Sequence, residues 1–346
     1  MDFSIASILL LDGLTNGAIY ALLGMCLVLV FTVTRIIFIP QGEFVAYGAL
    51  TLAIFQTGQV PGTVWLLLIL AATAALMDLV AVWRHRRRAA PALVAALRTF
   101  VPSAVVAGLS VWAAPRGLPM LLQALLTLGI VTCFGPLVYR VAYQSLAGAS
   151  TLVLLIVSVG VHFAMTGLGL LFFGAEGFRN PPFWDARMAL GPLNVSGQAL
   201  VIFGMSAVLI VVLWLFFERT LYGKALRATA VNRLGARLMG ISTNSAGQLT
   251  FALAAFIGGL SGLLIGPTTT IFYDSGFLIG LKGFVAAVIA GLASYPGALI
   301  GALSVGAIEA FGSFWASSFK EVIVFASILP VLLWRSLASG HSDEEH

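Results

Sequence analysis

Five ionisable side chains stand out within the long apolar segments of this sequence: Glu43, Asp78, His162, Lys282 and Glu309. A charged side chain at the centre of a bilayer costs about 2.5–3.5 kcal/mol, so such residues pair with one another or line a polar path. Lys282 is flanked only by glycines and apolar residues. Three interpretations are open: Lys282 extends to a membrane interface, it forms a structural ion pair with a carboxylate such as Glu309, or it faces a water-filled path.

The other reactive residue types point to structural roles. No second histidine or carboxylate lies at helical spacing from His162, so we expect a hydrogen-bonded core residue. Asp78 precedes an arginine cluster at 84–88, which favours a place at the membrane interface. Cys26 and Cys133 lie in apolar segments and are expected to be buried thiols. The sequence therefore predicts neither a catalytic site nor a metal site.

Two apolar segments are joined almost without a loop by Arg35-Ile-Ile-Phe-Ile-Pro40-Gln41-Gly42-Glu43. Pro40 lacks a backbone donor and Gly42 loosens the backbone, so a regular helix is not expected to run through this stretch. Broken helices commonly build transport sites, because their freed backbone groups must meet protein or cavity water. The sequence predicts a broken helix or a tight turn near 35–43, and an ordinary turn is the simpler interpretation.

The segment 218–245 is a basic connection between two apolar runs, with five lysine and arginine residues. Leu226, Ala230, Leu234 and Leu238 recur every four residues and predict one apolar helix face. Lys224, Arg227, Arg233 and Arg237 lie off that face, and Gly240 stands where the helix would end. We expect one short basic amphipathic helix, which either rests on anionic lipid or docks into a groove of a cytoplasmic partner.

The composition of the chain requires an apolar solvent. Hydrophobic residues make up 60% of the 346 residues and charged residues only 9%, whereas a soluble domain carries about 25% charged residues. Long unbroken apolar runs favour helices over a barrel. The net charge of +5 does not indicate a nucleic-acid partner, because the arginines cluster between apolar segments. The sequence predicts an all-α, polytopic transmembrane helix bundle in a lipid bilayer.

Candidate membrane spans lie at 15–34, 42–57, 62–83, 99–114, 117–140, 148–173, 198–217, 246–265, 276–294, 297–315 and 319–335. Several are short against the roughly 20 residues that a span needs, so we expect eight to eleven spans. Basic clusters after the third and seventh segments place those loops in the cytoplasm, and the balanced 174–197 segment is expected outside. The N-terminus is then outside and the C-terminus inside.

The chain is expected to form one transmembrane domain over 1–335, followed by a polar cytoplasmic tail at 336–346. The N-terminal Met1 to Leu11 carries no basic residue before its apolar stretch, so it lacks the charged region of a secretory signal. We expect this segment to remain in the mature chain.

Several motifs resemble the permease family of the branched-chain amino-acid ABC importers. The first is Gly223-Lys-Ala-Leu-Arg227-Ala, followed by Gly240-Ile241. Others are Asn16-Gly17 with Tyr20-Ala-Leu, Gly42-Glu43, and the run from Gly280-Leu-Lys282-Gly through Glu309-Ala310. The resemblance covers roughly 11–57 and 145–335 and leaves 60–140 as an extended region.

Two of these motifs depart from the family pattern. Val231-Asn232 stands where the family usually has Glu-Asp, and Phe38 and Gln41 replace the asparagine and histidine of Asn-Phe-Ala-His-Gly-Glu. Related permeases serve hydrophobic amino acids, urea, short amides and small carboxylic acids. A hydrophobic amino acid is the best single expectation for the substrate.

The resemblance implies a membrane subunit of an ATP-driven importer in a bacterial inner membrane. Its partners would be cytoplasmic ABC ATPase subunits that bind ATP-Mg, a second homologous permease subunit and an extracytoplasmic substrate-binding protein. No Gly-x-x-x-x-Gly-Lys-Ser/Thr loop occurs in the chain, so ATP hydrolysis is expected elsewhere and no cofactor is expected here.

The expected substrate-path residues are Asn16, Tyr20, Gln41, Gly42, Glu43, Lys282 and Glu309. The expected ATPase-coupling residues are Gly223, Lys224, Arg227, Asn232, Arg233, Arg237 and Gly240. The alternative is a secondary transporter or channel that works alone, for which the basic amphipathic helix would have no clear purpose. An intramembrane enzyme is disfavoured, because the membrane segments hold one histidine and no nucleophile motif.

Overall fold

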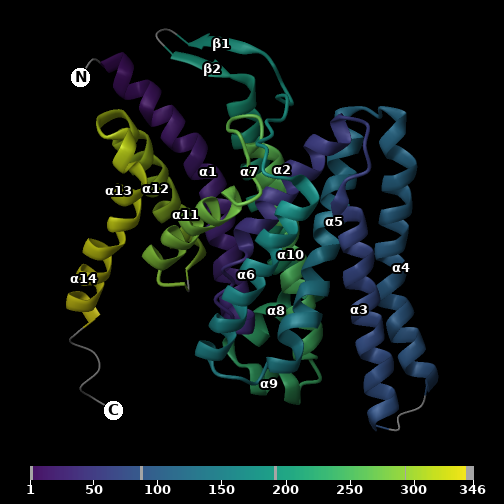
Figure 1. The fold of residues 1–346 in the computed structure, drawn as a ribbon. Helices are drawn as coiled ribbons and strands as arrows, with labels where there is room; N and C mark the ends of the chain where they lie inside the picture. Colours follow the sequence, from purple (N-terminus) through teal and green to yellow (C-terminus); the bar gives the residue numbers. More distant parts are fainter. Residues whose placement is uncertain (1–2, 86–88, 191–192, 293, 340–346) are drawn as a thin grey trace.

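The computed structural model describes residues 3–85, 89–190, 193–292 and 294–339, which form an almost entirely helical bundle (Figure 1). The first half holds α1 (Phe3–Thr34), α2 (Gln41–Gln56), α3 (Gly62–His85), α4 (Ala89–Ala113), α5 (Met120–Val138) and α6 (Thr151–Phe173). The second half holds α7 (Gly197–Arg219), α8 (Leu221–Val231), α9 (Arg233–Leu238), α10 (Thr243–Ile265), α11 (Ser275–Ile289), α12 (Tyr295–Trp315), α13 (Lys320–Ala326) and α14 (Ile328–Ser339).

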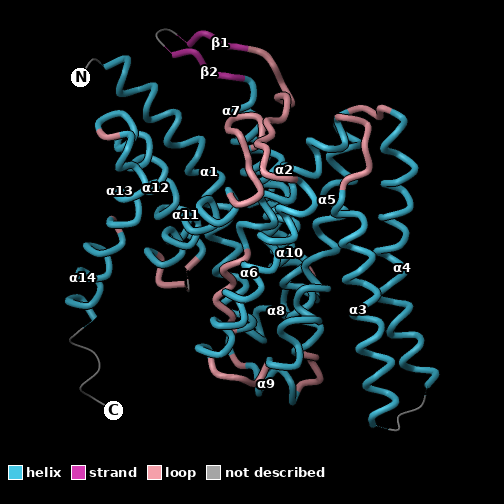
Figure 2. The backbone as a smooth tube through the Cα atoms, viewed as in Figure 1, coloured by secondary structure: helices cyan, strands magenta, loops and turns pink. Residues whose placement is uncertain are grey.

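Short irregular elements join these helices. They are the 3-10 turns η1 (Ala114–Arg116), η3 (Gln144–Leu146) and η4 (Ser317–Phe319), and the π-helix η2 (Tyr139–Tyr143). Strands β1 (Arg187–Leu190) and β2 (Leu193–Ser196) form one antiparallel hairpin at the end of the bundle (Figure 2). The prediction of an all-α polytopic bundle is confirmed.

Seven of the described helical segments are long and apolar enough to cross a membrane. They contain α1, α3, α5, α6, α7, α10 and α12. The predicted spans 42–57 and 276–294 are the shorter helices α2 and α11, of 16 and 15 residues. The predicted span 99–114 falls in the second half of α4, and 319–335 is divided between α13 and α14. The chain is therefore a multi-pass membrane protein that combines helices long enough to cross a bilayer with the shorter helices α2 and α11.

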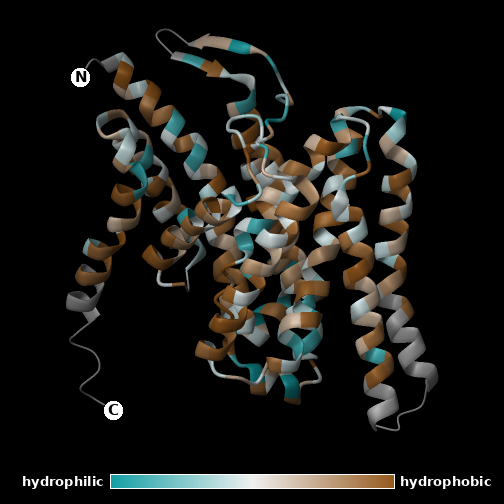
Figure 3. Cartoon of the chain, viewed as in Figure 1, coloured by the Kyte–Doolittle hydropathy of each residue, from teal (hydrophilic) through white to brown (hydrophobic). Residues whose placement is uncertain are grey.

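Apolar residues cover the outer faces of the helices as well as the interior (Figure 3). Phe163, Leu171 and Trp214 are among the most exposed large side chains outside the 221–239 segment. In water this surface would be strongly unfavourable, so it requires lipid or another apolar partner.

Helix α1 lies in the middle of the bundle and packs along α12, α10 and α11. Small residues permit the closest of these approaches, since a Cβ atom on Gly306 of α12 would lie 2.2 Å from the carbonyl oxygen of Gly13 of α1. Such close backbone packing is typical of helices associating in lipid, where van der Waals contact replaces the hydrophobic effect.

Between α1 and α2 the chain is non-helical over residues 35–40 and buried at Ile36 and Phe38. The amide Nε2 of Gln41 donates to the carbonyl of Ala254, 3.0 Å away and halfway along α10. Helix α2 therefore begins inside the bundle and not at its end. The predicted interruption near 35–43 is present, and it is a break and not an ordinary tight turn: six non-helical residues separate α1 from α2, which begins at Gln41 directly after Pro40.

Helices α3 and α4 form a hairpin at the edge of the bundle, beside α5 (Figure 1). This hairpin and α5 make up most of the region 60–140 that the family resemblance left unexplained. Residues 86–88 of the arginine cluster, between α3 and α4, lie outside the described residues. The predicted tail, 336–346, is described only to Ser339, where α14 ends.

Candidate functional site

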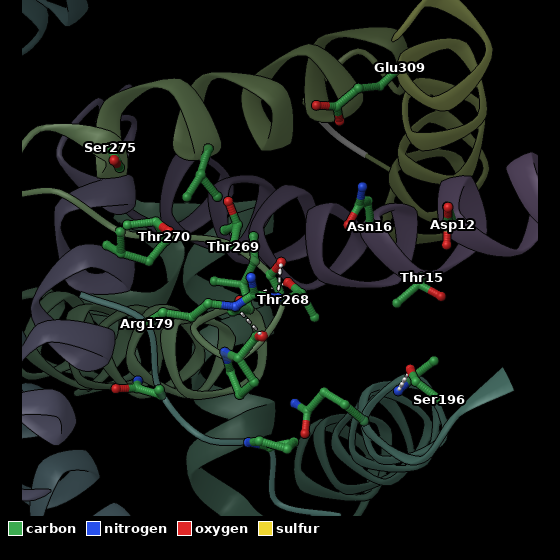
Figure 4. A pocket seen from close by; sticks show the side chains of 18 of the residues that line it. Asp12, Thr15, Asn16, Arg179, Ser196, Thr268, Thr269, Thr270, Ser275 and Glu309 are labelled. Carbon is green, nitrogen blue, oxygen red and sulfur yellow. Dashed lines mark hydrogen bonds between the residues drawn. The ribbon is translucent and has the colours of Figure 1, made fainter. Parts of the chain in front are cut away.

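A cavity of about 970 Å³ opens at the end of the bundle that carries the β1–β2 hairpin (Figure 4). Its walls are formed by α1, α11, α12, α13, the start of α7 and the segments before β1 and before α11. Four acidic and four basic residues line it: Asp12, Asp185, Glu309, Glu321, Arg179, Arg187, Lys282 and Lys320. A large cavity with balanced charges within a membrane protein is suited to a small polar or zwitterionic solute.

A buried ion cluster lies at the wall of this cavity formed by α11, α12 and α13. The Nζ atom of Lys282 donates to Oε1 of Glu309 at 2.5 Å and to Oε1 of Glu321 at 3.1 Å. The hydroxyl of Tyr20 donates to the other oxygen of Glu309, Oε2, at 2.6 Å. Only 7% of the Lys282 side chain and 10% of the Glu309 side chain are exposed, so each charge depends on its partners.

The cluster agrees with two of the interpretations of Lys282, the ion pair and the water-filled path. The structural pair with Glu309 exists, and both residues line the cavity. Glu321 was not among the predicted site residues. Its position in an apolar segment near the C-terminus gave a signal, since it is an ionisable residue in the predicted span 319–335. Its distance of 39 residues from Lys282 gave no spacing relation that could reveal the contact.

A polar stripe on α1 leads from the rim of the cavity to the ion cluster. Asp12, Asn16 and Tyr20 follow one another at intervals of four residues and all line the cavity. Residues at this spacing lie on one face of a helix. Figure 4 shows Asp12 and Asn16 in order along α1, with Glu309 on the neighbouring α12. The predicted residues Asn16 and Tyr20 are thus brought together with Lys282 and Glu309.

The opposite wall is formed by two loops that are hydrogen-bonded together. Phe178 and Ile271 exchange backbone hydrogen bonds of 2.9 and 2.8 Å. Arg179 donates to the carbonyls of Pro267 and Thr268, at 3.0 and 3.2 Å. These contacts satisfy backbone groups that would otherwise face the cavity without partners, and they fix Arg179 on this wall (Figure 4).

Gln41, Gly42 and Glu43 are buried at the beginning of α2 and do not line this cavity. A Cβ atom on Gly42 would lie 1.9 Å from the carbonyl oxygen of Gly276, so only glycine permits the observed contact between α2 and α11. The predicted substrate-path residues therefore divide into two groups. One group lines the cavity, and the other lies where the short helices α2 and α11 meet.

Glu43 makes its ion-pair contact with α6. The Nδ1 atom of His162 lies 2.9 Å from Oε1 of Glu43, and the Phe277 ring packs 4.7 Å from the histidine ring. His162 is hydrogen-bonded, as expected, and its partner is a carboxylate from another helix, which helical spacing around His162 could not reveal. Asp78 is ion-paired with Arg140 of the π-helix, a contact that the sequence did not reveal.

The basic segment 218–245 forms two helices, so the prediction of one helix was wrong. Asn232 has an extended backbone conformation between α8 and α9, and its side chain accepts a 2.8 Å hydrogen bond from the backbone N–H of Gly235. Asparagine is a favoured N-cap residue, and it starts a second helix here. The apolar face is divided as a result: Leu226 is buried on the bundle, whereas Leu234 and Leu238 are exposed.

The predicted coupling residues occupy distinct places in this helix pair. Gly223 packs on the end of α7, where a Cβ atom would lie 2.2 Å from the Phe216 carbonyl. Arg227 forms an exposed ion pair with Glu218. Arg233 reaches the carbonyl of Thr34, at the end of α1, at 3.5 Å.

The remaining three coupling residues are Lys224, Arg237 and Gly240, and all of them are exposed. Gly240 ends α9 with φ +83°, a conformation that favours glycine. Two further hydrogen bonds complete the helix end, from the N–H of Gly240 to Arg237 and from the N–H of Ile241 to Ala236. The expectation that Gly240 terminates the helix is confirmed.

These features define a class of protein. Interrupted segments whose short helices meet inside a bundle, beside a polar cavity, are typical of membrane transport proteins. The family model described as the permease component of the branched-chain amino acid transport system matches residues 9–332. The chain belongs to this family.

Individual relatives agree with this assignment. The high-affinity branched-chain amino acid transport system permease protein BraD of Pseudomonas aeruginosa is 32% identical over 62% of this chain and 73% of its own length. LivH of Escherichia coli, with the same description, is 30% identical over 59% of this chain and 68% of its own. PsaBC from Streptococcus pneumoniae in complex with Fab aligns over 94% of this chain and 90% of that chain, at 13% identity and a TM-score of 0.41. That similarity is too low to show a shared fold.

Proposed function

We propose that this chain forms the translocation path of an ATP-driven importer for branched-chain or other hydrophobic amino acids, or for a related small carboxylate or amide. The observation that carries the proposal is the family match over residues 9–332. The names of BraD and LivH support the substrate class. The cavity beside the Lys282 cluster is the chamber that would receive the substrate.

The two ends of the bundle have different roles in this proposal. The cavity and the β1–β2 hairpin lie at one end, and α8 and α9 lie at the other (Figure 1). Exposed Lys224, Arg227 and Arg237 support a cytoplasmic position for the second end, by the positive-inside rule. The cavity then faces the outside of a bacterial inner membrane, where a substrate-binding protein delivers the solute. The N-terminus is outside and the C-terminus is inside.

Helices α8 and α9 are the part of the chain suited to an ATPase subunit. Val231, Leu234, Leu238 and Met239 are exposed here, each at 69% or more. Exposed apolar side chains on a basic helix pair fit a groove on a protein partner. A groove would cover these side chains from several sides, whereas a bilayer surface would cover the helix pair from one side only. ATP and magnesium would bind to the ATPases, and a second permease subunit would complete the pore.

The experiment that tests this proposal is gentle affinity purification of the tagged chain from its native membranes, with mass spectrometry of the co-purifying subunits. We expect two ATPases and a second permease to be recovered, and addition of ATP with substrate-loaded binding protein to stimulate uptake in proteoliposomes. Recovery of the chain alone, with solute uptake that ATP does not affect, would instead establish the secondary transporter or channel.

A further inference from the structure

The ion cluster beside the cavity has an unused hydrogen-bond acceptor. Two carboxylates, Glu309 and Glu321, share the ammonium group of Lys282. Three of their four oxygens are hydrogen-bonded, two by Lys282 and one by Tyr20. Within the described residues, the fourth oxygen, Oε2 of Glu321, is buried and has no hydrogen-bond partner. A buried carboxylate oxygen without a hydrogen-bond donor is unfavourable, so a ligand that donates a hydrogen bond to this atom would stabilise it.

The charge of the cluster limits what that ligand can be. Two negative groups and one positive group leave the cluster with an excess negative charge. A substrate carboxylate that approached Lys282 would be repelled by both glutamates, and it would have to displace one of them. An ammonium group would meet two carboxylates and supply the missing donor to Oε2 of Glu321.

The position of the cluster places this acceptor at the wall of the cavity. Glu321, Glu309 and Lys282 all line the cavity, and 32% of the Glu321 side chain is exposed. Across the cavity, Arg179 uses its Nε and Nη2 atoms for backbone carbonyls, as shown in Figure 4, and its Nη1 atom makes no contact of that kind among the described residues. A zwitterion can therefore meet an acidic wall with its ammonium group and a basic residue with its carboxylate.

We propose that Glu321, held in place by Lys282 and supported by Glu309, is the binding site for the ammonium group of the substrate. This inference rests on the proposed function. It specifies which end of the substrate, the ammonium group, binds at this wall of the cavity and which residue binds it. It reverses the simplest interpretation of Lys282, which is to attract a carboxylate. Lys282 is a positioning residue for Glu321 and neutralises one of the two negative charges.

The test uses the purified transporter complex in lipid nanodiscs without binding protein, so that only the permease path can bind a ligand. Thermal unfolding is followed with three probes of similar shape: L-leucine, 3-methylbutylamine, which lacks the carboxylate, and 4-methylpentanoate, which lacks the amine. A ligand that binds the folded state raises the unfolding temperature, and at equal concentration the rise is larger for the ligand with the lower Kd. We expect L-leucine and 3-methylbutylamine to raise it and 4-methylpentanoate to have no effect.

Glu321→Gln removes the charge but keeps the side-chain shape, and we expect it to weaken binding of both amine-bearing probes at least tenfold. Glu176→Gln is the matched control, because Glu176 lies on the same end of the molecule but outside the cavity lining. Equal or better stabilisation by 4-methylpentanoate would overturn the proposal, as would unchanged amine binding in Glu321→Gln. The three-probe comparison in the unaltered protein remains decisive if the variant folds poorly. Failure of the importer proposal would appear separately, as amine binding without ATP-driven uptake.

Discussion

His162 of α6 lies with its Nδ1 atom 2.9 Å from Oε1 of Glu43, although 119 residues separate the two in sequence. The carboxylate of Glu43 is fully buried, and its second oxygen has no hydrogen-bond partner in the described residues. Helix α6 is otherwise largely exposed along its length. This contact joins a loosely packed helix to the beginning of α2, and the hydrogen bond from the Tyr47 hydroxyl of α2 to the Met165 carbonyl of α6, at 2.7 Å, reinforces it.

Replacing His162 with alanine is expected to destabilise the protein by about 3 kcal/mol, because it leaves Glu43 buried without its partner. Adding Glu43→Gln should recover part of that loss, since a neutral amide costs less to bury. Thermal unfolding in detergent measures both effects. Phe163→Ala, at an exposed neighbouring position, is the control. Strictly additive effects of the two substitutions would show that Glu43 and His162 do not stabilise each other.

Gly42→Ala is expected to reduce uptake at least tenfold, because its Cβ atom would force α2 away from α11. Gly167→Ala is a suitable control, since nothing lies within 4 Å of the Cβ position there. Uptake and membrane insertion should be measured together. If both variants transport equally well, the close contact at Gly42 has no role in transport.

Lys282→Ala should lower uptake without releasing the ATPase from the complex, because Glu309 and Glu321 would lose their shared cation. Repulsion between the two carboxylates is expected to open the wall of the cavity. Lys282→Arg should restore part of the activity, since it keeps the charge. Unchanged uptake by Lys282→Ala would return Lys282 to a purely structural role.

Arg227→Glu is expected to uncouple ATP hydrolysis from transport while leaving insertion intact, since it places a negative charge on the exposed face of α8. The same change also breaks the ion pair with Glu218. The double variant Arg227→Glu with Glu218→Arg separates the two effects, because it restores the pair with its signs exchanged. Full rescue by the double variant, or normal transport by the single one, would argue against contact between Arg227 and an ATPase.

Gly240→Ala should also weaken coupling, because alanine is strained at the φ of +83° that ends α9. We expect a loss of about 1 kcal/mol in local helix stability and a lower ratio of substrate transported to ATP hydrolysed. Gly204→Ala, with nothing within 4 Å of its Cβ position, is a control on α7. An unchanged transport ratio would show that this helix end does not contribute to coupling.

The sequence predicted the membrane bundle because apolar run length and charge content are local quantities. Tyr20, Lys282 and Glu309 could be selected in the same way, since each belongs to a recognisable motif or is a rare charge in an apolar segment. Their contact with one another could only be proposed. It depends on helices that are far apart in the chain and packed at angles that no local pattern encodes.

The misses have equally physical reasons. The break at Asn232 competes with a clean apolar period, and the capping asparagine overrode that period. The depth at which α2 begins depends on the contact of Gln41 with α10, which adjacent residues do not reveal. Glu321 and His162 each find partners on other helices, so spacing along their own helix carried no information.

The central position of α1 has a consequence for how the protein is made. Its main neighbours are α10, α11 and α12, so α1 is synthesised long before the helices on which it packs. During that interval Asn16 and Tyr20 must be tolerated by lipid or by the insertion machinery, because Glu309 has yet to be synthesised. Biogenesis should therefore be sensitive to truncation within α12, although that helix lies near the C-terminal end of the bundle sequence. A chain that stops before Glu309 would leave α1 without the residue that bonds Tyr20 and without most of its packing partner.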